Sequence, residues 1–436
     1  MTVRRSAWKS ALCAAAVALA AAIAARAQAP VFTPFHASGI YSLGEKAGWS
    51  VTPAPGSSSQ ATRYRFVILA NDRIPIQSGT LDLASGRAAI EVTAEEPAML
   101  YAEVLPEGPP ETVGTALKPI HLGAAIAPWK LQLSAPRPAD FDSFWDAKLQ
   151  ALAGVPMNPA LTPTPGAPTG VDLYTVKLDS LGSHVQGYLA KPAREGKFPA
   201  LVVFQYAGVY ALRTQTVTGP AAEGWLAFDV DSHDLPPQES RGVPNNYPSI
   251  GATDRETSYF LAMYLRDSRA IDYIASRPDW DGKTLVITGT SMGGQQSLAA
   301  AGLNPKVTAV IVNEPAGADL NADLHGRRAG YPNYPADQAN VMETALYFDP
   351  VNFASRIHVP VLAGIGFIDT TSPPAGIFTA LNQIAGPKEV VGMIDSDHNN
   401  RTPERQGVWV ARSKAVMELI LRGGVYTPDQ TWMAGR

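Results

Sequence analysis

Residues 284–302, which read TLVITGTSMGGQQSLAAAG, constrain the fold of this chain more than any other stretch. The first five residues are an apolar run typical of a buried strand, and the residues after Gly293 are good helix formers that end at Gly302. Between them, Gly289-Thr290-Ser291-Met292-Gly293 has the G-x-S-x-G spacing of a nucleophile elbow, in which the two glycines leave room for the adjoining strand and helix. The alternative is a structural glycine-rich turn. We predict that Ser291 is a nucleophile at the N-terminus of a helix.

Strands alternate with helices on both sides of this turn. β-α alternation with β-branched apolar strands predicts a parallel sheet that is covered by helices on both faces. An antiparallel pair of strands, expected at 173–178 and 185–191, precedes the series, which is how an α/β-hydrolase fold begins. The predicted fold class is therefore α/β, of the α/β-hydrolase type. The other strands are expected at 200–204, 226–230, 307–312, 361–366 and 389–394, and the main helices at 260–275 and 409–421.

The part of the chain before this series has the texture of a small β-sandwich. Between residues 30 and 122, short alternating or apolar runs recur at roughly ten-residue spacing and are separated by turn signals such as Asn71-Asp72. We expect an Ig-like sandwich domain there, a linker at 123–135 and a catalytic domain at 136–436. The expected strands of the sandwich are 64–69, 79–83, 88–93, 99–105 and 116–122.

Residues 1–29 are expected to be a removable export signal. Arg4, Arg5 and Lys9 precede an alanine-rich apolar core, which is followed by a small-residue cleavage site. The core is too short for a permanent membrane span, so we expect a periplasmic or extracellular mature protein without one, exported by the general or the twin-arginine route. Its removal leaves 31 basic against 39 acidic residues and takes away Cys13, the only cysteine. This balance argues against nucleic acid or an anionic membrane as a partner, and the loss of the thiol excludes a cysteine nucleophile.

A serine nucleophile needs a histidine to accept its proton and a carboxylate to orient that histidine. In an α/β-hydrolase the acid and then the histidine follow the serine along the chain, each on a loop after a strand. His398 follows the last expected strand and is the predicted base, whereas His325 lies too early and His358 precedes a strand. Asp369 directly follows the strand at 361–366 and is the predicted acid. Asp395 and Asp397 are competitors by residue type, but they lie too close to His398 in sequence.

The oxyanion hole requires two N–H donors. One is expected from the backbone of Met292, directly after the nucleophile, and the other from the loop at 205–208, where Tyr206 is the expected donor although the sequence does not fix the register of the turn. The sequence has no HExxH motif and no paired histidines, so we expect neither a metal nor a cofactor.

With these residues in place, residues 130–425 resemble the acetyl xylan esterase / cephalosporin C deacetylase family of α/β-hydrolases. The resemblance rests on a set of short motifs around the elbow: the entry at 136–145, Arg241-Gly242, Asp254-Arg255-Glu256, the segment at 277–281, Gly326-Arg327 and Phe367-Ile368-Asp369-Thr370. It implies a cofactor-independent enzyme that removes small acyl groups, mainly acetyl, from sugars in acetylated oligo- or polysaccharide. Many members form ring-shaped hexamers, but the added N-terminal domain could block that packing, so a homo-oligomer stays an open expectation.

The sequence departs from the family pattern at two positions near the predicted nucleophile. Met292 stands where the family often has glutamine, and Gln205-Tyr206 replaces a His-Gly-Tyr type of oxyanion loop. Two further functions therefore stay open. One is an exported hydrolase of longer acyl esters, feruloyl esters or peptides, and the other is a carbohydrate-binding protein that has kept the fold without catalysis.

Overall fold

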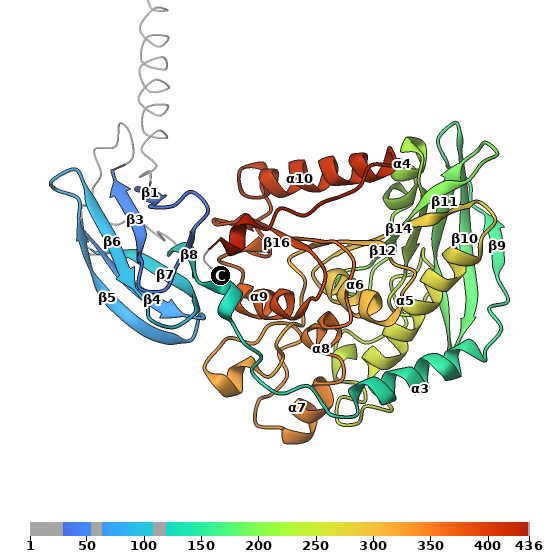
Figure 1. The fold of residues 1–436 in the computed structure, drawn as a ribbon, viewed down its shortest axis with the longest axis horizontal. Helices are drawn as coiled ribbons and strands as arrows, with labels where there is room; N and C mark the ends of the chain where they lie inside the picture. The colour runs from blue at the N-terminus through green and yellow to red at the C-terminus, as the bar shows by residue number, and fades with distance from the viewer. Residues whose placement is uncertain (1–28, 54–62, 108–118, 435–436) are drawn as a thin grey trace, which may run out of the picture.

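The structure is a computed structural model that describes residues 29–53, 63–107 and 119–434. Figure 1 shows a small β unit beside a larger unit in which helices surround a long sheet. The predicted export signal lies outside the described residues except for its last one, Ala29. Among the described helices, none combines the length and the apolar character that a bilayer crossing needs.

The N-terminal unit consists of two sheets that share one apolar core. A three-stranded sheet has the order β1-β3-β6, and a five-stranded sheet has the order β2-β8-β7-β4-β5. Trp49 and Ile90 of the first sheet pack in the same core as Ile68 and Leu100 of the second, which gives the sandwich arrangement that the sequence predicts. The strands are β1 (Val31–Pro34), β2 (Ile40–Tyr41), β3 (Lys46–Thr52), β4 (Arg63–Ala70), β5 (Ile74–Asp82), β6 (Ala88–Thr93), β7 (Ala98–Pro106) and β8 (Ile120–Ile126).

The expected start of the linker at residue 123 is wrong, because β8 continues through Ile126. Gly123 pairs with Tyr101 of β7, and Ile126 pairs with Tyr41 of β2. The small residues of this segment reflect close packing, since a Cβ added at Gly123 would lie 2.5 Å from the Cβ of Phe367 in the larger unit. Met99 and Ala125 accordingly belong to the same apolar core as Phe367. The sandwich is therefore packed directly against the larger unit.

The larger unit is built on a nine-stranded sheet in the order β17-β16-β15-β14-β12-β13-β11-β10-β9. From β12 to β17 the strands pair in parallel, and the β9–β11 end is antiparallel. This is the predicted α/β-hydrolase arrangement. The strands are β9 (Ala160–Pro163), β10 (Val171–Ser180), β11 (Ser183–Pro192), β12 (Phe198–Phe204), β13 (Leu226–Val230), β14 (Trp280–Thr290), β15 (Ala309–Asn313), β16 (Val361–Gly366) and β17 (Lys388–Met393).

Helices cover both faces of this sheet. In Figure 1, α4 and α10 lie on one side, and α5, α6 and α9 lie on the other, with α3, α7 and α8 farther out. The cores agree, because Val217 and Ile420 pack on one face and Ile271, Leu298 and Phe378 pack on the other. The helices are α3 (Phe141–Ala153), α4 (Gln215–Glu223), α5 (Tyr259–Ser276), α6 (Met292–Leu303), α7 (Ala339–Ala345), α8 (Pro350–Ala354), α9 (Pro374–Gln383) and α10 (Pro403–Leu421), with short 3₁₀ turns at η1 (Pro128–Lys130), η2 (Tyr247–Ser249), η3 (Ala322–His325) and η4 (Thr431–Met433).

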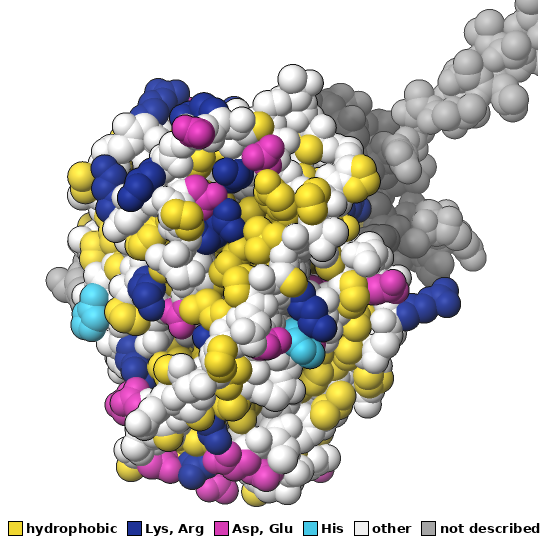
Figure 2. All heavy atoms as spheres, turned by 90° about the vertical axis from the view of Figure 1, so that its right-hand side faces the viewer, with side chains coloured by type: hydrophobic (Ala, Val, Ile, Leu, Met, Phe, Trp, Pro, Cys, Tyr) yellow, Lys and Arg dark blue, Asp and Glu magenta, His cyan; other side chains and the backbone are white. Residues whose placement is uncertain are grey.

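The face that lies at the right in Figure 1 carries charges of both signs. Figure 2 shows basic and acidic side chains interspersed across it, with apolar side chains between them. A surface of this kind has no single-sign field over its width, unlike the basic patches that bind polyanions.

Candidate active site

Ser291 lies in the predicted turn between β14 and α6. Its backbone has φ 56° and ψ −123°, a strained conformation for a residue with a side chain, and its N–H donates to the carbonyl of Asn313 at 3.0 Å. A Cβ added at Gly289 would lie 2.3 Å from the carbonyl carbon and oxygen of Gly293, and one at Gly293 would lie 2.2 Å from the carbonyl oxygen of Phe204. The prediction that both glycines are needed for close backbone packing is confirmed.

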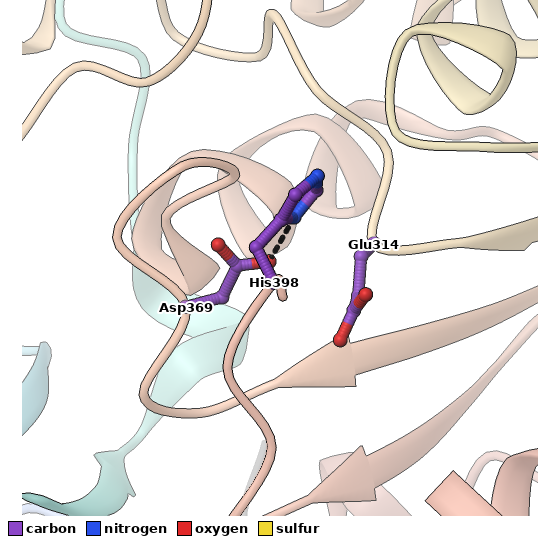
Figure 3. Close-up of side chains that lie close together, drawn as sticks. All are labelled: Glu314, Asp369 and His398. Atoms are coloured by element: carbon purple, nitrogen blue, oxygen red, sulfur yellow. Dashed lines mark hydrogen bonds and ion pairs between the residues drawn. The ribbon is translucent and has the colours of Figure 1, made fainter. Parts of the chain in front are cut away.

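The structure brings Ser291, His398 and Asp369 together at the carboxyl edge of the sheet. His398 Nε2 lies 2.9 Å from Ser291 Oγ. Its Nδ1 lies 2.7 Å from Asp369 Oδ2, the bond drawn as a dashed line in Figure 3. An ionised carboxylate can only accept hydrogen bonds, so Nδ1 carries the hydrogen. Nε2 is therefore left to accept a hydrogen bond from the serine O–H. The other oxygen of Asp369 accepts the N–H groups of Thr371 and Ser372, each at 2.8 Å, which fixes the carboxylate.

The competing residues lie elsewhere. His325 and His358 are both exposed. Asp397 is bound on its own loop, where Oδ1 accepts the N–H groups of Asn399 and Asn400 and Oδ2 pairs with Arg405 at 3.1 Å. Its carboxylate therefore stabilises the turn that carries His398.

The two residues expected at the oxyanion hole lie on either side of the elbow. Met292 is the first residue of α6, where a backbone N–H has no acceptor within the helix. Its sulfur lies 3.2 and 3.4 Å from the hydroxyl oxygens of Tyr247 and Tyr331. Tyr206 follows the end of β12 by two residues, is 51% exposed and stacks its ring on that of Tyr210. The two backbone N–H groups as oxyanion donors stay predictions.

Comparison with known proteins assigns the chain to a family. The sequence model of the family described as Acetyl xylan esterase (AXE1) matches residues 130–411. The acetyl esterase Axe7A of Xylanibacter ruminicola is 30% identical over 399 residues, which cover 87% of this chain and 89% of that protein. The chain belongs to the acetyl xylan esterase family. It is therefore a carboxylic ester hydrolase, and the family supports a function in the deacetylation of carbohydrate.

Solved structures support the fold of this esterase. An acetyl xylan esterase from Paenibacillus sp. R4 aligns with a TM-score of 0.59 at 24% identity and covers 68% of this chain and 98% of its own. Acetyl xylan esterase 1 from Thermoanaerobacterium sp. JW/SL YS485 aligns with a TM-score of 0.57 at 23% identity and covers 68% and 97%. These matches confirm the α/β-hydrolase fold.

The loop of the esterase that carries Tyr206 is held by hydrogen bonds to buried polar side chains that the sequence analysis missed. Gln296 Nε2 donates to the carbonyl of Gln205 at 2.8 Å. His233 Nε2 lies 3.1 Å from the carbonyl of Gly208, whose N–H donates to the Tyr247 hydroxyl at 3.4 Å. Burial lowers the pKa of His233 to about 4, so a neutral ring donates this bond at neutral pH. The loop is thereby fixed beside the elbow.

Glu314 is a second carboxylate beside the pair of His398 and Asp369, and the sequence analysis missed it as well. It directly follows β15, just as Asp369 follows β16, and this parallel placement is the signal that could have revealed it. Within the described residues, Glu314, Asp369 and His398 form one set whose potential ligand atoms all lie within 4.8 Å of one another (Figure 3). A metal ion there would have to displace Arg401 from Glu314 and break the hydrogen bond between His398 and Asp369. In the described residues these side chains are engaged in hydrogen bonds and an ion pair.

Proposed function

We propose that this esterase removes acetyl groups from acetylated oligo- or polysaccharide through a Ser-His-Asp triad and an acyl-enzyme intermediate. The observation that carries the proposal is the continuous hydrogen-bonded chain from Asp369 through His398 to Ser291, at 2.7 and 2.9 Å. Membership of the acetyl xylan esterase family supports the choice of acetylated carbohydrate as the substrate.

In the acylation step, Ser291 Oγ attacks the acetyl carbonyl carbon while its proton passes to His398 Nε2. Asp369 keeps the imidazole in the required tautomer and stabilises the imidazolium. The N–H groups of Met292 and Tyr206 hold the developing oxyanion. The bond between the acetyl carbon and the sugar oxygen then breaks, and the proton on Nε2 passes to that oxygen, so the sugar leaves as an alcohol and acetyl-Ser291 remains.

In the deacylation step, a water molecule takes the place of the sugar. His398 Nε2 accepts a proton from this water, whose oxygen attacks the acetyl carbonyl. When the tetrahedral intermediate collapses, the proton returns to Ser291 Oγ and acetic acid is released. No external oxidant, reductant or cofactor is required.

The proposal includes the location of the enzyme and the size of its acyl group. The leader at 1–29 would deliver the mature enzyme to the periplasm or the extracellular space. Tyr247 and Tyr331, whose hydroxyls lie 2.7 Å apart beside Met292, fill space next to the elbow. Their bulk favours a short acyl group such as acetyl over a feruloyl group.

The test measures acetate release from acetylated xylo-oligosaccharides by the mature enzyme and by Ser291→Ala. We expect the variant to lose on the order of 10⁴-fold or more in kcat. Ser276→Ala is the matched control, because its hydroxyl only caps the end of α5 through the carbonyl of Tyr273 at 2.7 Å. This control should keep wild-type turnover.

Three results would contradict the proposal. Near wild-type turnover of Ser291→Ala would remove Ser291 as the nucleophile. Faster hydrolysis of butyryl or feruloyl esters than of acetyl esters would change the substrate class. Cleavage of aminoacyl amides without acetate release would indicate a peptidase.

A further inference from the structure

Glu314 is a fully buried carboxylate that the triad mechanism does not use. Its side chain is 0% exposed, and one of its oxygens lies within 4.8 Å of the facing atoms of Asp369 and His398. Figure 3 shows it beside the His398–Asp369 pair, on the segment that follows the neighbouring strand. Because a buried carboxylate is costly unless it is paired, its presence here requires an explanation.

Four features hold Glu314 in this position. Its Oε1 accepts hydrogen bonds from Gln406 Nε2 at 2.9 Å and from Ser396 Oγ at 3.2 Å. Its Oε2 forms an ion pair with Arg401 at 3.3 Å. Its backbone has φ 46°, an unfavourable value for a glutamate, and its N–H donates to the carbonyl of Gly364 at 2.8 Å. Strain of this kind persists only where the surrounding structure imposes it.

Neighbouring backbone makes room for the carboxylate. A Cβ added at Gly366, the last residue of β16, would lie 2.9 Å from Glu314 Oε1. Glu314 Oε2 accepts no hydrogen bond among the described residues, although the Arg401 guanidinium lies next to it. One oxygen is thus fixed by neutral donors, and the other has the Arg401 guanidinium as its ion-pair partner.

The charged groups that face Glu314 come from two loops. Asp369 faces it from the loop after β16, and His398 and Arg401 face it from the loop after β17, whereas α10 presents the neutral Gln406. Burial and the nearby Asp369 carboxylate raise the pKa of Glu314 to about 7, against the opposing effects of Arg401 and His398. Glu314 therefore changes from neutral to negative near neutral pH.

We infer that Glu314 is a second acid of this active site, a positioning residue that acts through His398. In the acylation step His398 becomes a cation, and a carboxylate in a poorly screened site stabilises that cation. Asp369 holds the Nδ1 hydrogen, and Glu314 adds negative charge when it is ionised. With Asp369 neutralised, Glu314 becomes the remaining carboxylate beside the ring. This inference rests on the proposed Ser-His-Asp mechanism.

The first test compares the pH dependence of kcat for the wild-type enzyme and Glu314→Gln, an isosteric change that cannot ionise. Below its pKa Glu314 is neutral, so the two enzymes should differ little at pH 5.5. Above its pKa only the wild type carries the charge, so the wild-type advantage should grow to about tenfold at pH 8.5. A purely structural role for Glu314 would give a rate ratio that does not change with pH, and that result would overturn the inference.

Asp349→Asn is the matched control. Asp349 is another buried carboxylate whose pKa is raised to about 7 by burial, but its oxygens accept the N–H groups of Leu320 and Val351 at 2.6 and 3.0 Å and not groups of the triad. The ratio of the wild-type kcat to that of Asp349→Asn should stay constant across the same pH range. A ratio that rises with pH in this variant too would show that any buried carboxylate has this effect, and the inference would fail.

The second test removes the two acids singly and in combination, and its Asp369 single variant also serves if Glu314→Gln does not fold. Loss of the acid in a triad typically costs about 10⁴-fold in kcat. With Glu314 present, Asp369→Ala, which places no amide donor against His398 Nδ1, should lose only about 10²-fold, and its residual rate should rise with pH. The double variant Asp369→Ala/Glu314→Gln should fall to the 10⁴-fold loss. A 10⁴-fold loss in Asp369→Ala alone would exclude the supporting role.

Ser291→Ala, measured in parallel, separates the two proposals. If it keeps wild-type turnover, the triad mechanism fails and the inference about Glu314 fails with it. If Ser291→Ala is inactive while the ratio of wild type to Glu314→Gln is constant with pH, only the inference about Glu314 fails.

Discussion

Replacing Gly123 by alanine tests whether the sandwich helps to position the catalytic acid. The added Cβ would lie 2.5 Å from the Cβ of Phe367 and 2.9 Å from its carbonyl carbon and oxygen. Phe367 is 1% exposed, its N–H donates to the carbonyl of Met393 at 3.0 Å, and it precedes Asp369 by two residues. Because backbone atoms are involved, rotation of a side chain cannot relieve the contact.

The size of the effect follows from these distances. Restoring an ordinary contact of about 3.5 Å between carbon atoms requires the loop or β8 to move by roughly 1 Å. Overpacking of this kind typically costs about 1–3 kcal/mol in the free energy of unfolding. A displacement of about 1 Å at a catalytic group can lower turnover by on the order of 10²-fold. We therefore expect Gly123→Ala to lose both stability and kcat.

Urea unfolding and the kcat for p-nitrophenyl acetate measure the two effects. Gly407→Ala in α10 is the matched control, because a Cβ there would meet nothing within 4 Å. A glycine-to-alanine change inside a helix should stabilise the protein by about 0.5–1 kcal/mol. If Gly123→Ala kept the wild-type unfolding midpoint and a kcat within about twofold, the close contact between β8 and Phe367 would not exist, and the reasoning would be refuted.

Two further predictions concern the polar groups around the elbow and the core. Tyr247→Phe removes the hydroxyl that accepts the N–H of Gly208, so kcat should fall about tenfold with little change in KM, and an unchanged kcat would show that the loop needs no such support. Burial raises the pKa of Asp229 to about 8, so the folded protein keeps a proton that the unfolded chain releases above about pH 4. The free energy of unfolding should therefore fall progressively as the pH rises from 4 to 8. Asp229→Asn should therefore gain in Tm relative to wild type between pH 5 and pH 8, whereas a constant Tm difference would contradict the assignment.

The sequence was sufficient to predict which residues meet at the site because the fold orders them. In a parallel sheet all strands end at one edge, so a serine after β14, an aspartate after β16 and a histidine after β17 must lie near one another. The same reasoning covers Glu314 after β15, but its positive φ and its partners on α10 depend on contacts that no local pattern encodes. The donors behind the Tyr206 loop were hidden for the same reason.

The sandwich was predicted less completely, and the reason is physical. The small residues of β8 resemble a linker in isolation, and their role becomes visible only when Phe367 fills the space that they leave. β3 was missed although Trp49 and Val51 lie in the sandwich core, because Gly48 breaks the alternation of the strand.

In the larger unit, α4 was missed as well, since it contains both Gly219 and Pro220, which are poor helix formers.

The turn between β4 and β5 forms a second set of contacts between the sandwich and the larger unit. The carbonyl of Asn71 accepts the N–H of Arg328, Asp72 pairs with the Arg328 side chain at 3.0 Å, and Arg73 pairs with Asp323 at 2.6 Å. These bonds hold the segment that leads to Tyr331, and the shared apolar core around Phe367 holds the loop of Asp369. Within the described residues, the two units are therefore joined at two separate places, the β4–β5 turn and strand β8. An engineer who trims the chain at residue 123 would sever a strand and uncover Phe367, and would not obtain a smaller enzyme of the same shape.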